Sequence, residues 1–127
     1  MPAPRNPVWQ VLVVDDEPAV CSAIKMMLQF EGHEVLTAYN GKDALTLLKK
    51  NKFDLITLDY FMTGMKGNDL ATTIKKRLPG QPVIMITAYA DSLKSSGNPI
   101  PGVDYIISKP FVLKDLREAI ARVLPEN

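Results

Sequence analysis

The chain has 127 residues, of which 46% are hydrophobic and 23% charged, so it holds enough material for one compact domain but not for two. Lysine and arginine total 15 against 14 aspartates and glutamates, and this balance argues against a basic nucleic-acid surface or a membrane-binding face. The single cysteine, Cys21, excludes an intramolecular disulfide framework, and no apolar run has the length of a signal-peptide core or a membrane span. We therefore expect a cytoplasmic domain that contacts neither membrane nor nucleic acid.

The elements begin after a head rich in proline. Residues 1–8 are expected to be flexible, and residues 9–125 to form the folded domain. A first strand is predicted at 11–14, then a helix whose first turn suits Pro18 and which Gly32 ends. The spacing of one buried helical face is shown by Val20, Ile24, Met27 and Leu28.

The middle of the chain repeats this alternation. Residues 34–38 mix polar and apolar side chains, which is typical of an edge strand. The runs 55–58 and 83–86 are almost continuously apolar, as strands buried on both faces are. A second helix is expected to direct the side chains of Ala44, Leu47 and Leu48 into the core. A third runs from about Asn68 to Pro79-Gly80 and is expected to bury Leu70, Ala71, Ile74 and Leu78.

The segment after the fourth strand limits its helix. Asp91 is a fair N-cap, but Gly97 and Pro99 follow so soon that only about one to two helical turns can form. We expect the remainder to cross the sheet edge as an irregular strap, the least stable part of the domain. A fifth strand is predicted at 105–107. A last helix is expected to bury Val112, Leu116, Ala119, Ile120 and Val123.

Short apolar runs that alternate with helical segments predict an α/β fold. The expected architecture is a single doubly wound, five-stranded parallel sheet with helices on both faces, the fourth of them short or irregular. Binding sites of such sheets lie beyond the carboxyl ends of the strands.

Polar side chains follow four of the predicted strands at that edge. Asp15 and Asp16 follow the first strand, Asp59 the third, Thr87 the fourth and Lys109 the fifth. Three neighbouring carboxylates repel one another unless a cation compensates, and a set of oxygen ligands suits Mg²⁺. Thr87 and Lys109 offer a hydroxyl and a positive charge to phosphoryl oxygens, and Asp59 is the expected nucleophile.

Four motifs closely resemble the receiver domain of two-component response regulators. The similarity runs from about residue 10 to 124, and the motifs occupy 13–18, 59–67, 87–88 and 109–111. The resemblance implies that Asp59 is the phosphoacceptor and that Asp16, Asp59 and the Phe61 carbonyl ligate Mg²⁺, with Asp15 acting through water. It assigns Lys109 and Thr87 to the phosphoryl group, and implies strand order 2-1-3-4-5 and a cis peptide between Lys109 and Pro110.

The resemblance also implies partners. A sensor or hybrid histidine kinase, or a phosphotransfer protein, would donate the phosphoryl group, and a downstream protein would respond. The stretch 102–111 is similar to receivers attached to hybrid kinases. Such a domain is a signalling switch that catalyses its own phosphorylation and dephosphorylation, and is not an enzyme acting on other substrates.

Two residues depart from the receiver pattern. Thr63 stands where proline is usual, which should loosen that turn without touching a proposed ligand. Ile106 occupies the place of the switching aromatic in many receivers, with Tyr105 one position earlier. We therefore expect a switch that acts on the strap through Thr87 rather than by rotation of a ring.

Two other functions agree less well with the sequence. A small-molecule phosphatase with an aspartate nucleophile usually has a second acid two residues later, and Phe61 stands there instead. A flavodoxin-like nucleotide binder would need a phosphate-binding loop after the first strand, where residues 15–18 would repel phosphate in the absence of a metal.

Overall fold

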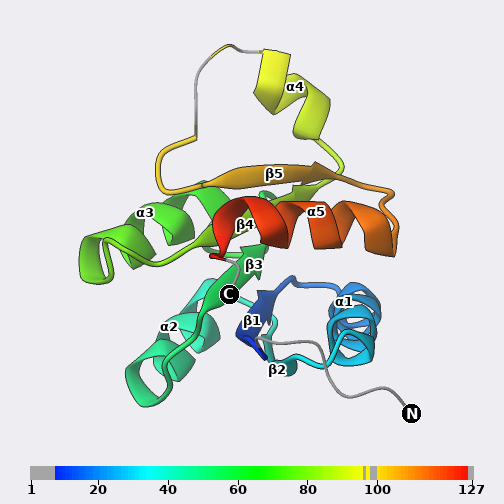
Figure 1. The fold of residues 1–127 in the computed structure, drawn as a ribbon. Coiled ribbons are helices and arrows are strands. Elements are labelled where there is room, and N and C mark those ends of the chain that lie inside the picture. The colour runs from blue at the N-terminus through cyan, green and yellow to red at the C-terminus, as the bar shows by residue number, and fades with distance from the viewer. Residues whose placement is uncertain (1–7, 96, 98–99, 126–127) are drawn as a thin grey trace.

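Five parallel strands form one sheet in a computed structural model that describes residues 8–95, 97 and 100–125. The strands are β1 (Gln10–Val14), β2 (Glu34–Ala38), β3 (Leu55–Leu58), β4 (Val83–Thr87) and β5 (Tyr105–Ser108). Their spatial order is β2-β1-β3-β4-β5 (Figure 1), so the expected order and the edge position of 34–38 are confirmed. Because all the strands run the same way, their carboxyl ends meet at one edge, which we call the C-terminal edge.

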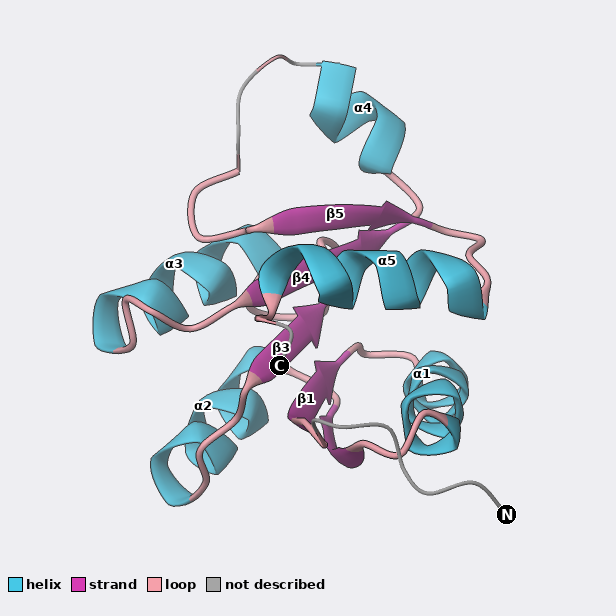
Figure 2. Ribbon diagram, viewed as in Figure 1, coloured by secondary structure: helices cyan, strands magenta, loops and turns pink. Residues whose placement is uncertain are grey.

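The described residues form five helices, which are α1 (Pro18–Phe30), α2 (Gly41–Lys50), α3 (Gly67–Arg77), α4 (Ala90–Ser95) and α5 (Leu113–Val123). Of these, α1 and α5 cover one face of the sheet and α2 and α3 the other, while α4 lies beyond β5 (Figure 2). Local sequence explains several of their ends. Pro18 occupies the first turn of α1, Gly32 follows that helix with φ at 90°, and the amide of Asp43 donates to the Asn40 side chain that caps α2.

The core consists of two layers, one on each side of the sheet. Val11 and Val13 pack with α1 and α5, while Leu12 and Val14 pack with α2 and α3. This period of two follows from the pleat of a strand. Both sets are buried, which explains why the central strands read as continuous apolar runs.

The fourth helix is as short as the sequence predicts. It spans six residues and lies beyond β5 (Figure 1), where Leu93 packs against the core layer shared with α2 and α3. Asp91, expected to be the N-cap, instead lies in the first turn, because the helix already begins at Ala90. The strap includes residues 96 and 98–99, which lie outside the described residues, as do residues 1–7 of the predicted head.

Two residues predicted to be buried are exposed instead. Leu78 is 41% exposed, because α3 ends at Arg77 and Leu78 lies just beyond its inward face. Val112 is 61% exposed, because it is the N-cap of α5 and lies before the helical face turns inward. Its amide donates to the carboxylate of Asp115 over 2.8 Å. Among the described residues, no helix combines the length and the apolar character that crossing a bilayer requires.

Candidate functional site

The C-terminal edge brings three of the predicted polar residues into direct contact. The ammonium of Lys109, just after β5, lies 3.0 Å from Asp15 Oδ2 and 3.3 Å from Asp59 Oδ2. Asp15 follows β1 and Asp59 follows β3, so the contact joins three separate strands. The peptide between Lys109 and Pro110 is cis, as the resemblance implied.

The charges of this cluster depend on one another. Asp15 and Asp59 are both buried, and a buried carboxylate without a partner is costly. Burial raises the pKa of Asp59, and the negative charge of Asp15 adds to this, while Lys109 opposes it. Burial works against the charge of Lys109, but its hydrogen bond to Asp15 and the charges of both carboxylates still raise the pKa of Lys109. The lysine therefore stays positive between the two acids.

A backbone amide and a side-chain ammonium hold the two oxygens of the proposed nucleophile. Asp59 Oδ1 accepts a hydrogen bond from the Tyr60 amide at 2.7 Å, while Oδ2 faces Lys109. The chain packs closely behind it, since a Cβ at Gly67 would lie 1.9 Å from the Asp59 carbonyl oxygen. The start of α3 thus packs directly against the backbone of Asp59.

Asp16 is held by a different part of the site. Its Oδ2 accepts hydrogen bonds from the Thr63 amide at 3.0 Å and from the Thr63 hydroxyl at 3.1 Å. The prediction that Thr63 touches no proposed ligand is therefore wrong. No sequence pattern indicated this contact, because it depends on how the loop between β3 and α3 folds back toward β1.

The acidic residues after β1 form a set of oxygen donors that suits a hard cation. Carboxylate oxygens of Asp15, Asp16 and Glu17 lie within 4.8 Å of one another. Within the described part of the chain, no hydrogen bond reaches the carbonyl oxygen of Phe61, another proposed ligand. Oxygen-only donors of this kind fit Mg²⁺, which keeps several water ligands.

Thr87 lies at the same edge but takes no part in the ion-pair cluster. It is fully buried at the end of β4, and its Oγ1 accepts a hydrogen bond from the Tyr89 amide at 3.2 Å. Its carbonyl oxygen accepts from the Lys109 amide at 2.9 Å. Thr87 therefore links the backbone after β4 to the backbone that carries Lys109.

Two aromatic side chains stand together at this edge. The rings of Phe61 and Tyr89 lie 4.5 Å apart between centroids, in an edge-to-face arrangement. They are 46% and 52% exposed. We call these two residues the aromatic pair.

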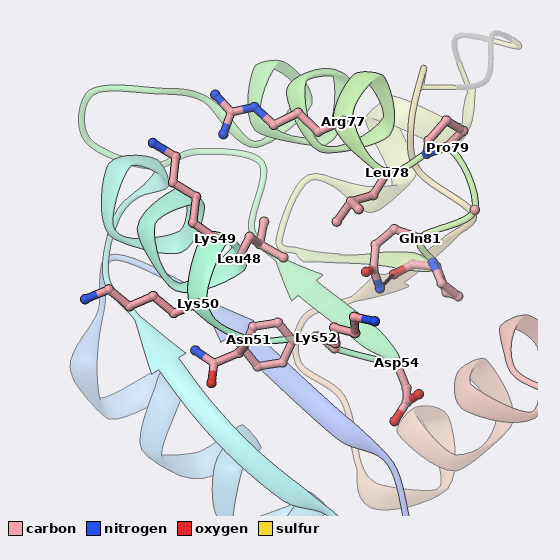
Figure 3. A pocket seen from close by; sticks show the side chains of 13 residues that line it. Leu48, Lys49, Lys50, Asn51, Lys52, Asp54, Arg77, Leu78, Pro79 and Gln81 are labelled. Carbon is pink, nitrogen blue, oxygen red and sulfur yellow. Dashed lines mark hydrogen bonds between the residues drawn. The ribbon is translucent and has the colours of Figure 1, made fainter.

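A hollow of about 740 Å³ lies at the opposite edge of the sheet, near the ends of α2 and α3 (Figure 3). Leu48 and Leu78 line it, together with basic side chains such as Lys52 and Arg77. Its one acidic residue, Asp54, accepts a hydrogen bond from the Gln10 amide. The acidic chemistry thus lies at the C-terminal edge and not in this hollow.

Comparison with known proteins decides the family. The family model of the response regulator receiver domain matches residues 11–121. This chain belongs to that family. Receiver domains are phosphorylation-switched modules of two-component signalling that bind Mg²⁺.

Relatives of the receiver domain include longer regulators. The heme response regulator HssR of Staphylococcus aureus (strain Newman) is 40% identical over 116 residues, which are 91% of this chain and 51% of HssR. The probable transcriptional regulatory protein TcrX of Mycobacterium tuberculosis is 34% identical over 84% of this chain and 45% of TcrX. The receiver domain thus spans about half the length of these curated relatives.

Solved structures share its fold over almost the whole chain. The Thermotoga maritima response regulator TrrA, crystallised in complex with Mg²⁺ and BeF, is 35% identical with a TM-score of 0.78, and the match covers 91% of this chain and 98% of TrrA. The chemotaxis response regulator CheY4 of Vibrio cholerae is 29% identical with a TM-score of 0.83, and the match covers 92% and 99%. The receiver fold predicted from the sequence is confirmed.

Proposed function

We propose that this receiver domain accepts a phosphoryl group onto Asp59 from a histidine kinase or a phosphotransfer protein, in a reaction that requires Mg²⁺. The placement of Lys109 between Asp15 and Asp59 is the observation that carries the proposal. It puts a positive charge beside the one carboxylate that the backbone holds in place at the end of the third strand. Phosphoryl transfer depends mainly on such positioning and charge compensation.

Each residue of the proposed site has its own role in phosphoryl transfer. Asp15, Asp16, Asp59 and the Phe61 carbonyl would hold Mg²⁺, which when bound neutralises charge on the phosphoryl oxygens. The Asp59 oxygen forms the new bond to phosphorus while the phosphorus–nitrogen bond of the donor breaks. Lys109 then pairs with the transferred group, and the Thr87 hydroxyl donates to it. The same arrangement supports the later hydrolysis, so the domain would act on itself and not on other substrates.

We further propose that the signal leaves through protein contacts near α4. Ile106 packs in the core layer next to α2, α3 and Leu93 of α4, whereas Tyr105 packs in the opposite layer. Tyr105 therefore faces the wrong side of the sheet to replace a switching aromatic beneath α4. A change at Thr87 would instead reach α4 through the Tyr89 amide that it binds.

The amino-acid composition supports the proposed kind of downstream partner and the proposed cellular compartment. The balance of basic and acidic residues supports output through a downstream protein instead of direct nucleic-acid binding by this domain. The single cysteine fits a cytoplasmic setting.

Acetyl phosphate with Mg²⁺ tests the site without a partner. Intact-mass spectra should show one added phosphoryl group, which chelation of the metal should prevent. Asp59→Asn removes the nucleophile and keeps the shape, so it should abolish the adduct. An unchanged adduct on this variant would show that Asp59 is not the acceptor.

A further inference from the structure

The carboxylate of Asp16 is bound by both donors of a single residue. Thr63 donates from its backbone amide at 3.0 Å and from its hydroxyl at 3.1 Å, and both bonds end on Oδ2. The two residues are 47 positions apart in the chain, so the contact joins the loop after β1 to the loop after β3. One proposed metal ligand is thereby tied to the loop that follows the nucleophile.

This arrangement gives the two carboxylate oxygens of Asp16 different roles. Two donors on Oδ2 leave the other oxygen for a cation, and metal-ligating carboxylates in proteins are commonly oriented in this way. Asp15 is fixed by other groups, namely the Glu17 amide on Oδ1 and Lys109 on Oδ2. Asp16 therefore depends on Thr63 alone among the hydrogen-bond donors described.

We propose that Thr63 is a positioning residue that orients Asp16 for Mg²⁺. The inference rests on the metal site of the proposed function and adds a residue to it. Proline, which has no amide hydrogen and no hydroxyl, would offer neither donor at this position. The contact thus belongs to this chain's threonine and is not a general consequence of the fold.

Three substitutions separate the contributions of the two donors. Thr63→Val removes the hydroxyl and keeps the size and the amide, Thr63→Ser keeps both donors, and Thr63→Pro removes both. Because the Thr63 side chain is exposed, the Val and Ser variants should melt like the unmodified protein. Thr73→Val is a matched control, since its exposed hydroxyl bonds only the Asp69 carbonyl within α3.

The measurement is a MgCl₂ titration followed by the amide NMR signal of Glu17, whose N–H donates to Asp15. Thr63→Val should raise the dissociation constant about tenfold and Thr63→Pro at least as much. Thr63→Ser and Thr73→Val should stay close to the unmodified protein. Unchanged or tighter binding by Thr63→Val would overturn the positioning role. Absence of Mg²⁺ binding by the unmodified protein would instead overturn the metal site of the proposed function.

Discussion

Gly67 and Asp59 are in such close contact that a Cβ at Gly67 would lie 1.9 Å from the carbonyl oxygen of Asp59. We expect Gly67→Ala to push α3 away from β3 and to lower the free energy of unfolding by about 1–3 kcal/mol. The same shift should slow phosphorylation, because it moves the backbone that holds Asp59.

Urea denaturation of Gly67→Ala should therefore give an earlier midpoint. Gly80→Ala is the control, since a Cβ there meets no atom within 4 Å, and its effect should stay within about 0.5 kcal/mol. Equal midpoints for the two variants would show that the start of α3 can shift without lowering the stability of the protein.

Lys109→Ala should separate metal binding from phosphoryl transfer. Without the ammonium, Asp15 and Asp59 face one another with no positive charge between them, so Mg²⁺ should bind at least as tightly. The rate of adduct formation from acetyl phosphate should fall about 100-fold, because the transferring oxygens lose their partner. Lys114→Ala, which removes an exposed lysine of α5, should change neither property. Loss of Mg²⁺ binding in Lys109→Ala would contradict the division of roles proposed here.

The aromatic pair should lengthen the life of the phosphorylated state. Phe61 and Tyr89 lie two positions beyond Asp59 and Thr87, and neither ring is a base that could activate water. We predict that combining Phe61→Asn with Tyr89→Glu shortens the lifetime of phosphoaspartate severalfold. Tyr89→Phe keeps the ring and should leave the lifetime unchanged. Mass spectra taken over time after removal of the donor measure the decay, and an equal or slower decay in the double variant would refute the shielding role.

His33 should make stability fall in mild acid. Burial lowers the pKa of His33, and its Nδ1 accepts a hydrogen bond from the Trp9 amide at 3.1 Å. The unfolded chain therefore binds the proton more readily than the folded protein does. The stability that neutral His33 adds is complete above about pH 6.5 and is lost as the pH falls toward the lowered pKa. Urea denaturation measures the free energy of unfolding at pH 7.5 and at pH 5.5. Between these two pH values, that free energy should fall more for the unmodified protein than for His33→Gln. Parallel losses would exclude this contribution.

Most of the fold was predictable because its signals are local. Buried parallel strands leave continuous apolar runs, and a glycine at 97 with a proline at 99 in the sequence predicts a short helix after β4. Asp91 and Val112 were misplaced because helix starts depend on where the chain turns, which a short sequence pattern fixes only to within a residue or two.

The site was predictable only in part. The edge that carries Asp15, Asp59 and Lys109 follows from strand direction, so the sequence alone could bring them together. The bond between Thr63 and Asp16 could not be foreseen, since it depends on the path of a loop and not on any periodic pattern. The close approach of Gly67 to the backbone of Asp59 also depends on the tertiary structure. The one sign of it in the sequence is a glycine at the start of a helix.

The single tryptophan of the chain lies far from the acidic cluster. Trp9 precedes β1, whereas Asp15 follows it, and six residues of extended chain separate them by roughly 20 Å. The indole packs partly buried against the core layer of α1 and α5. Its fluorescence should therefore follow unfolding of that layer and respond little to direct contact at the site. A change in indole emission on phosphorylation would report a rearrangement that had crossed the length of the sheet.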